Sequence, residues 1–255
     1  MDLSEFRDRL NGRLDHDDYA DVDPSANGLQ VGRADGRTLE HVAFAVDGVA
    51  ATAATAGTAG ADLLVVHHGL VWGGLDRVTG RAYDRIATLA EHDLPLYVSH
   101  LPLDGHPELG NAARLADFLG CEPTEPFGDV GGVTVGQRAR AAEPYTVAGL
   151  RDRLSALDTG GKPVDVLDFG PEEVRDVAIV TGAGTDWLEP AAAAGVDALV
   201  TGEGKGQTYH EAREAGVNVF LAGHYATETF GVRALQDLVD EWGLETTFLD
   251  HPTGL

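Results

Sequence analysis

The strongest constraint on the fold is a pair of matching segments in the two halves of the chain. The apolar stretch VAFAVD at 42–47 is followed by ADLLVV at 61–66, and VAIVTG at 177–182 is followed by VDALVT at 196–201. The two starts are 19 residues apart in both halves, with an alanine-rich segment between them. Strands that alternate with helices predict a mostly parallel sheet. We therefore expect an α/β protein of two interlinked, pseudo-duplicated units.

These units are expected at 1–125 and 126–255, and the C-terminal helix can pack back on the first. The boundary is suggested by segment 122–132, where Pro123, Pro126 and three glycines indicate a linker or a turn into a new unit. The short apolar run at 133–135 is then expected to be an edge strand.

The charge of the chain limits its partners and its setting. There are 42 acidic and 18 basic residues, which gives a net charge of −24 with no long acidic block. Such a surface repels nucleic acid and anionic membranes, and it suits the salt-rich cytosol of a halophile.

A single cysteine, Cys121, excludes an internal disulfide and a cysteine-based zinc cluster. With neither a signal peptide nor a long apolar run, we expect a cytoplasmic protein without a membrane span.

Candidate functional side chains follow the expected strands. His224 and Glu228 are four residues apart and come directly after the apolar run 217–222. In open α/β sheets, ligands bind at the carboxyl ends of the strands, and an imidazole with a carboxylate makes half of a transition-metal site. The alternative is a helix cap at Thr227 beside an incidental histidine.

Two earlier strand ends carry matching groups. His67 and His68 close the strand at 63–66, and Asp104 follows the strand that ends before His100. A histidine pair on the surface and a simple Asp-Gly turn are the alternatives to metal binding here. In the aligned halves, the His100 segment HLPLD and the His224 segment HYATE are expected to be counterparts.

Five candidate ligands are too many for one tetrahedral zinc ion, which takes three from the protein at a catalytic site. They suit two ions about 3.5–4 Å apart, bridged by a carboxylate and water. Mixed nitrogen and oxygen donors favour iron, zinc, manganese, cobalt or nickel over calcium or magnesium. Three further groups remain as acid–base or supporting residues: His100, Glu203 and His210.

At this point the sequence resembles the Nif-three-like dinuclear metal centre proteins, also labelled type-two GTP cyclohydrolase I homologues. The resemblance is carried by NGLQVG (27–32), VVHHG (65–69), SHLPLDGHPELGN (99–111), TGEGKGQT (201–208) and AGHYATE (222–228). It implies that the metal ligands are His67, His68, Asp104, His224 and Glu228. It further implies that Asp104 or Glu228 bridges two metals, and that the subunits form a homohexameric ring.

Three functions follow as expectations. The first is a metal-dependent hydrolase that acts through a metal-bridging water, with Glu203 or His100 moving the proton. The second is a metal carrier or cofactor-assembly protein without turnover of its own. The third, GTP ring opening, follows from the family label only, because the glycine-rich segment 202–206 lacks the spacing of a P-loop.

Overall fold

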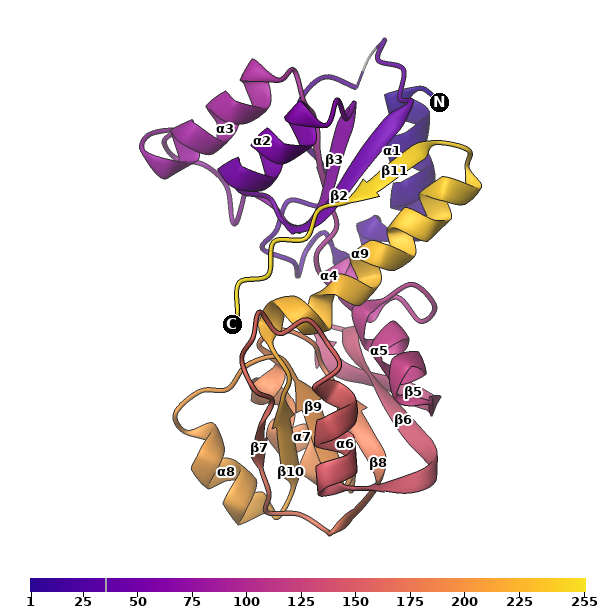
Figure 1. Cartoon of the computed structure of the whole chain (residues 1–255), viewed down its shortest axis with the longest axis vertical. Coiled ribbons are helices and arrows are strands. Elements are labelled where there is room, and N and C mark those ends of the chain that lie inside the picture. Colours follow the sequence, from indigo (N-terminus) through magenta and orange to yellow (C-terminus); the bar gives the residue numbers. More distant parts are fainter. Residues whose placement is uncertain (35) are drawn as a thin grey trace. The chain divides into compact units, whose positions relative to one another are not determined.

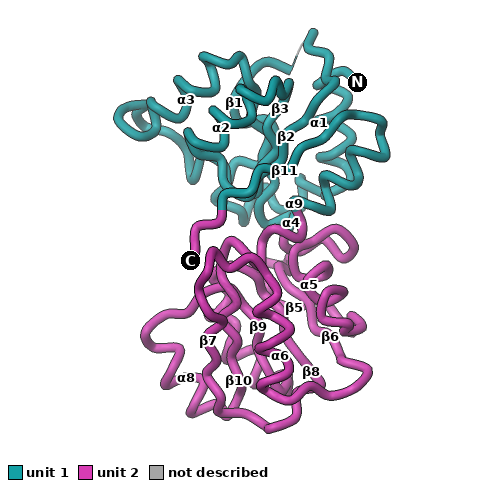
Figure 2. The backbone as a smooth tube through the Cα atoms, in the orientation of Figure 1, with its two compact units in different colours: residues 1–103, 232–251 teal, residues 104–231, 252–255 magenta. Residues whose placement is uncertain are grey.

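The computed structural model describes residues 1–34 and 36–255, which form two compact units (Figure 2). The first comprises residues 1–103 and 232–251, and the second comprises residues 104–231 and 252–255. The first division therefore lies at 103/104, whereas the sequence analysis expected it at 125/126. The reason is helix α5 (Asn111–Leu119), because its buried residues Leu115 and Leu119 pack into the core of the second unit.

The first unit is built on a five-stranded sheet in the order β1-β4-β3-β2-β11. Strand β1 is antiparallel to β4, and the other neighbours are parallel. Helices α2 and α3 lie on one side of the sheet, and α1 and α9 lie on the other (Figure 1). The elements are α1 (Leu3–Arg13), η1 (His16–Tyr19), β1 (Gly28–Val31), β2 (His41–Asp47), α2 (Ala50–Thr58), β3 (Leu63–His68), α3 (Arg81–Glu91), β4 (Leu96–Val98), the end of α9 (His224–Glu241) and β11 (Glu245–Phe248).

Alternation of side chains along the strands separates the two faces of this sheet. Ala43 and Ala45 pack against the small residues Ala53 and Ala56 of α2 in one apolar cluster. On α1, Phe6 lies edge-on to Tyr97 of β4 and to Trp242, with ring centroids 6.0 and 5.5 Å apart. The alanine-rich helix can thus approach the sheet closely, while large aromatic side chains fill the space beside α1.

The second unit is built on a six-stranded sheet in the order β5-β6-β8-β9-β10-β7. Its three central strands β8, β9 and β10 are parallel, and the outer neighbours are antiparallel. The elements are α5, β5 (Cys121–Val130), β6 (Val133–Thr146), α6 (Val147–Leu154), β7 (Asp165–Leu167), β8 (Glu173–Ile179), η2 (Gly184–Trp187), α7 (Leu188–Ala193), β9 (Ala198–Thr201), α8 (Thr208–Ala215), β10 (Asn218–Leu221) and the start of α9. Helix α4 (Leu101–Gly105) contains the division at 103/104.

The prediction of a linker at 122–132 was wrong, because most of this segment is strand β5, which pairs with β6 as an antiparallel hairpin. Pro123 and Pro126 are tolerated because β5 is the edge of its sheet, where a missing backbone N–H removes no obligatory ladder bond. Strand β6, expected as a short edge strand at 133–135, instead runs from Val133 to Thr146 between β5 and β8.

Pseudo-duplication is visible in the strand order, since β1-β4-β3-β2 and β7-β10-β9-β8 follow the same plan with one antiparallel edge strand each. One pair of hydrogen bonds, from two backbone N–H groups to an aspartate carboxylate, recurs in both copies. Asp62 Oδ2 accepts the backbone N–H groups of Glu40 and His41, at 2.8 and 3.0 Å. Asp197 Oδ2 accepts those of Arg175 and Asp176, at 2.8 and 2.9 Å.

The strand register corrects one detail of the internal alignment. Ser99 N donates to Val66 O, and at the equivalent place Ala222 N donates to Thr201 O. Ser99 therefore corresponds to Ala222, and His100 corresponds to Gly223 rather than to His224. Within residues 1–34 and 36–255, no helix combines the length and the apolar character that crossing a lipid bilayer requires.

The repeated carboxylate predicts equal effects in the two copies. Replacing Asp62 or Asp197 with alanine leaves two backbone donors without their acceptor, which we expect to lower the free energy of unfolding by about 1–3 kcal/mol in each case. Chemical denaturation of Asp62→Ala and Asp197→Ala measures this. The exposed Asp76→Ala is the control, and an effect no larger than the control's in either copy contradicts the interpretation.

Candidate metal centre

In the first unit, three histidine rings come together, two from the last residues of β3 and one from just after β4. The ring centroids of His67 and His68 are 4.6 Å apart, and that of His100 lies 5.1 Å from His67 and 5.8 Å from His68. One ring nitrogen of each lies within 4.8 Å of the other two. Strand β3 extends through both histidines rather than ending at Val66.

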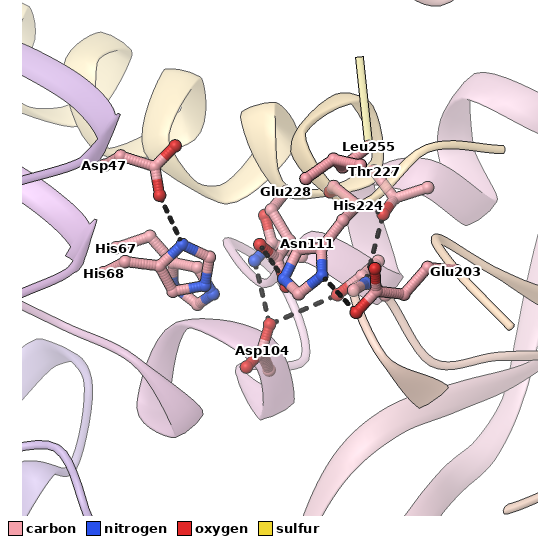
Figure 3. A network of polar contacts seen from close by, with 12 residues as sticks. Asp47, His67, His68, Asp104, Asn111, Glu203, His224, Thr227, Glu228 and Leu255 are labelled. Carbon is pink, nitrogen blue, oxygen red and sulfur yellow. Dashed lines mark hydrogen bonds and ion pairs between the residues drawn. The ribbon is translucent and has the colours of Figure 1, made fainter. Parts of the chain in front are cut away.

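Each of these rings has an oxygen acceptor at Nδ1. The distances are 3.0 Å from His67 to the carbonyl of Ser99, 2.9 Å from His68 to Asp47 Oδ1 and 2.9 Å from His100 to Asp23 Oδ1. Figure 3 shows the contact between Asp47 and His68. An acceptor at Nδ1 favours the tautomer with its proton there, so that Nε2 presents its lone pair. Histidines that bind metals commonly have this arrangement.

Asp23 is a buried acceptor that joins the loop before β1 to the end of β4. Its side chain is 1% exposed and accepts the backbone N–H groups of Ser25 and Leu101, the amide of Asn27 and the ring of His100. Burial would raise the pKa of this carboxyl group, but the hydrogen bond and charge of His100, with the bonds from Asn27 and Ser25, lower the pKa below its usual value. Asp23 therefore stays ionised at neutral pH.

In the second unit, the start of α9 brings an imidazole and two carboxylates together. His224 Nε2 lies 3.1 Å from Glu228 Oε2, one helical turn later, and His224 Nδ1 lies 3.1 Å from Glu203 Oε1. One oxygen of Asp104 lies within 4.8 Å of one oxygen of Glu228. Asp104 and Glu228 are both buried.

Asp104 is held by two neutral donors of the same unit. Asn111 Nδ2 donates to Asp104 Oδ1 at 2.9 Å (Figure 3). Thr181 Oγ1 donates to the same oxygen at 3.2 Å. Asn111 Oδ1 in turn accepts the backbone N–H of Gly231 at 2.7 Å. Asp104 lies in the short helix α4, whereas the sequence analysis placed it after a strand and considered an Asp-Gly turn as the alternative to metal binding.

Two glycines make room for the second group. An added Cβ at Gly182 would lie 2.1 Å from Glu228 Oε1, and one at Gly202 would lie 2.6 Å from His224 Cα. Gly182 also has a φ of +59°, which favours glycine. The backbone that follows β8 and β9 therefore approaches the ligand candidates as closely as only glycine permits.

The structure thus gathers the candidates within each unit: His67, His68 and His100 in the first, and Asp104, His224, Glu228 and Glu203 in the second. His210 is exposed on α8. The sequence analysis missed the supporting residues Asp23, Asp47, Asn111 and Thr181. Asn111 is the last residue of the motif at 99–111, but its role, like the roles of the other three, depends on contacts between residues far apart in the chain.

The donor set fits a transition metal. Imidazole nitrogens with oxygen acceptors at Nδ1 and buried carboxylates suit zinc, iron and related ions, while calcium and magnesium prefer oxygen donors. Within residues 1–34 and 36–255, His67, His68 and His100 are a possible nitrogen donor set, and Asp104 and Glu228 are possible oxygen donors.

Known proteins and a family model match this chain over nearly its whole length. A family model described as Duf34/NIF3 (NGG1p interacting factor 3) matches residues 1–253. A Halobacterium salinarum protein named GTP cyclohydrolase 1 type 2 homolog is 60% identical, with 100% of both chains covered. An Escherichia coli K12 protein of the same name is 40% identical, with 99% of each chain covered. The crystal structure of TTHA1606 from Thermus thermophilus is similar with a TM-score of 0.89, 41% identity and 100% of both chains covered.

Gly182→Ala tests the packing around Glu228. The new methyl group would displace the carboxylate, and we expect Co²⁺ affinity to fall roughly tenfold or more, as when the support of a metal ligand is removed. Isothermal titration measures the affinity. Gly195→Ala is the matched control, since Gly195 also has a positive φ, +71°, but its added Cβ would meet no described atom within 4 Å. Equal affinities of the two variants would refute the prediction.

Beneath the first group, His16 is a buried histidine that bonds to the strand end. Its Nε2 lies 3.0 Å from Ser99 Oγ, and its ring stacks on Tyr97 at a centroid distance of 5.8 Å. Burial lowers the pKa of His16 to about 4, although the charges of Asp23 and Asp17 act to raise it. His16 is therefore neutral in the folded protein at neutral pH.

This pKa predicts a loss of stability in acid. Between pH 6.5 and about 4, the unfolded chain binds a proton at His16 that the folded chain does not, so stability falls as the pH falls through that window. The contribution is at most about 3 kcal/mol. Urea denaturation of metal-free protein at several pH values measures the slope. His16→Gln keeps a polar partner for Ser99 without titrating, and it should have a shallower slope; an unchanged slope contradicts the assignment.

Proposed function

The chain belongs to the Duf34/NIF3 family, and from this premise we propose that it is a metal-dependent hydrolase with a dinuclear centre. The proposed ligands are His67, His68, Asp104, His224 and Glu228. Iron and zinc are the first candidates, with manganese, cobalt and nickel as alternatives. The observation that carries the proposal is the shared anchoring of the histidine rings, each with an oxygen at Nδ1.

When bound, two such ions would act as Lewis acids that polarise an electrophile and make water a stronger nucleophile near neutral pH. Among the residues assigned to proton transfer from the sequence, Glu203 suits the role better. Its side chain is 45% exposed, so it can exchange protons with solvent, and it contacts His224. The side chain of His100 is 16% exposed and is bonded to Asp23.

A metal carrier or cofactor-assembly protein is the alternative function. It is favoured by the partial exposure of two proposed ligands, since the side chains of His68 and His224 are 20% and 27% exposed. GTP ring opening draws support from the names of relatives. Segment 202–206 adds little support for GTP binding, because Lys205 in this segment forms an ion pair with Asp186.

Metal content is the first test. Elemental analysis of protein purified without added metal should give about two transition-metal ions per chain. Glu228→Gln and His68→Ala should each lower this content, because each removes a ligand. His210→Ala, which changes an exposed histidine, should not. A wild-type chain that holds no transition metal after loading and desalting refutes the proposed centre.

Turnover separates the two functions. The metal-loaded chain is assayed against phosphoesters, amides and nucleotides, GTP included, and chelator competition is followed in parallel. A hydrolase should retain its metal and lose roughly 100-fold or more of its rate in Glu203→Gln, since general acid–base catalysis contributes about that much. No turnover together with rapid transfer of metal to an acceptor instead identifies a carrier.

The assembly is a separate proposal. By family resemblance we propose a homohexamer, without nucleic acid or membrane as a partner. Light scattering after size-exclusion chromatography gives the mass directly. A monomer or dimer at micromolar concentration in high salt would contradict it.

A further inference from the structure

We propose that His67, His68 and His100 form a three-nitrogen cation site within the first unit, and that Asp23 is the positioning residue that fixes His100 for it. This inference deepens the proposed function, since it assigns His100 as a metal donor in addition to the five ligands named above. It does not require the second unit to contribute a ligand.

The first argument is distance. One nitrogen of each ring lies within 4.8 Å of the other two. Nitrogen ligands about 2.1 Å from a tetrahedral ion lie roughly 3.4 Å apart. Small rotations of the rings about their side-chain bonds close the difference, so one ion can reach all three.

The second argument is the orientation of His100. Its Nδ1 lies 2.9 Å from Asp23 Oδ1, and its backbone N–H donates to Asn27 Oδ1 at 2.7 Å. Asn27 in turn donates its own amide to Asp23 Oδ2 at 2.8 Å. Asp23 therefore holds the ring of His100 and Asn27 holds its backbone, and the bond at Nδ1 favours the tautomer with the lone pair at Nε2.

The third argument is the support of the surrounding loops. Gln30 Oε1 accepts the backbone N–H groups of Leu70 and Val71, directly after the histidine pair, at 2.8 and 3.1 Å. The motif at 27–32 thus fixes His100 through Asn27 and the chain after His68 through Gln30. This gives the motif a role that the five ligands leave unexplained: it orders the loops that present the three rings.

The experiment isolates the first unit's donors in the full chain. In a variant with Asp104→Ala, His224→Ala and Glu228→Ala, we expect about one Co²⁺ per chain, with the strong visible absorption of a low-coordinate cobalt ion. Adding His100→Ala should weaken Co²⁺ binding at least tenfold and change that spectrum. Adding Asp23→Asn should weaken it roughly tenfold, in line with the loss of a carboxylate that orients a metal-binding histidine.

Controls keep the outcome clear. Asp17→Asn, at an exposed position of the same region, should leave Co²⁺ affinity unchanged, and circular dichroism checks that each variant is folded. If His100→Ala fails to fold, His100→Gln takes its place.

The outcomes separate the two proposals. If the triple variant binds no Co²⁺ while the wild type binds two ions, this inference fails and the proposed centre stands. If the triple variant binds one ion and His100→Ala leaves affinity and spectrum unchanged, His100 is not a donor. If the wild type binds none, both proposals fail.

Discussion

The hydrogen bonds to histidine Nδ1 are the interactions on which the candidate centre depends. The acceptors are the backbone carbonyl of Ser99 and the carboxylates of Asp47 and Asp23. At His224, the Glu203 carboxylate lies at Nδ1 as an ion-pair partner. In each case the contact restrains the plane of the ring and favours the tautomer with its proton at Nδ1. A histidine without such a partner would rotate, and its lone pair would have no fixed direction.

The sheets explain why these partners are within reach. Parallel strands place their carboxyl ends along one edge, so the last residue of β2, the last residues of β3 and the residues after β4 become neighbours. Asp47 pairs with His68 across β2 and β3 in this way. The second unit repeats the plan with β8, β9 and β10, yet it places two glycines and one glutamate where the first has three histidines. The two copies thus share a frame and differ in donor chemistry.

Much of this frame could be predicted from the sequence, because apolar strands and alanine-rich helices have strong local patterns. The alanine-rich segment between the first two matching stretches forms helix α2, as the alternation of strands and helices predicted. The β5–β6 hairpin could not be predicted so well, since prolines are typical of linkers and only the edge position makes them compatible with a strand. The ligand candidates could be named from strand ends, but Asp23 and Asn111 act through contacts 77 and 120 residues away along the chain.

The tight packing at Gly202 has a consequence for how the two copies can change over time. Gly202 corresponds to His67, and its Cα faces the backbone of His224 and the carbonyl of Gly182 so closely that a side chain has no space. Placing an imidazole there would require the neighbouring turn and helix start to move together. One substitution at this position therefore cannot make the second copy equivalent to the first, because the backbone around it would have to change as well.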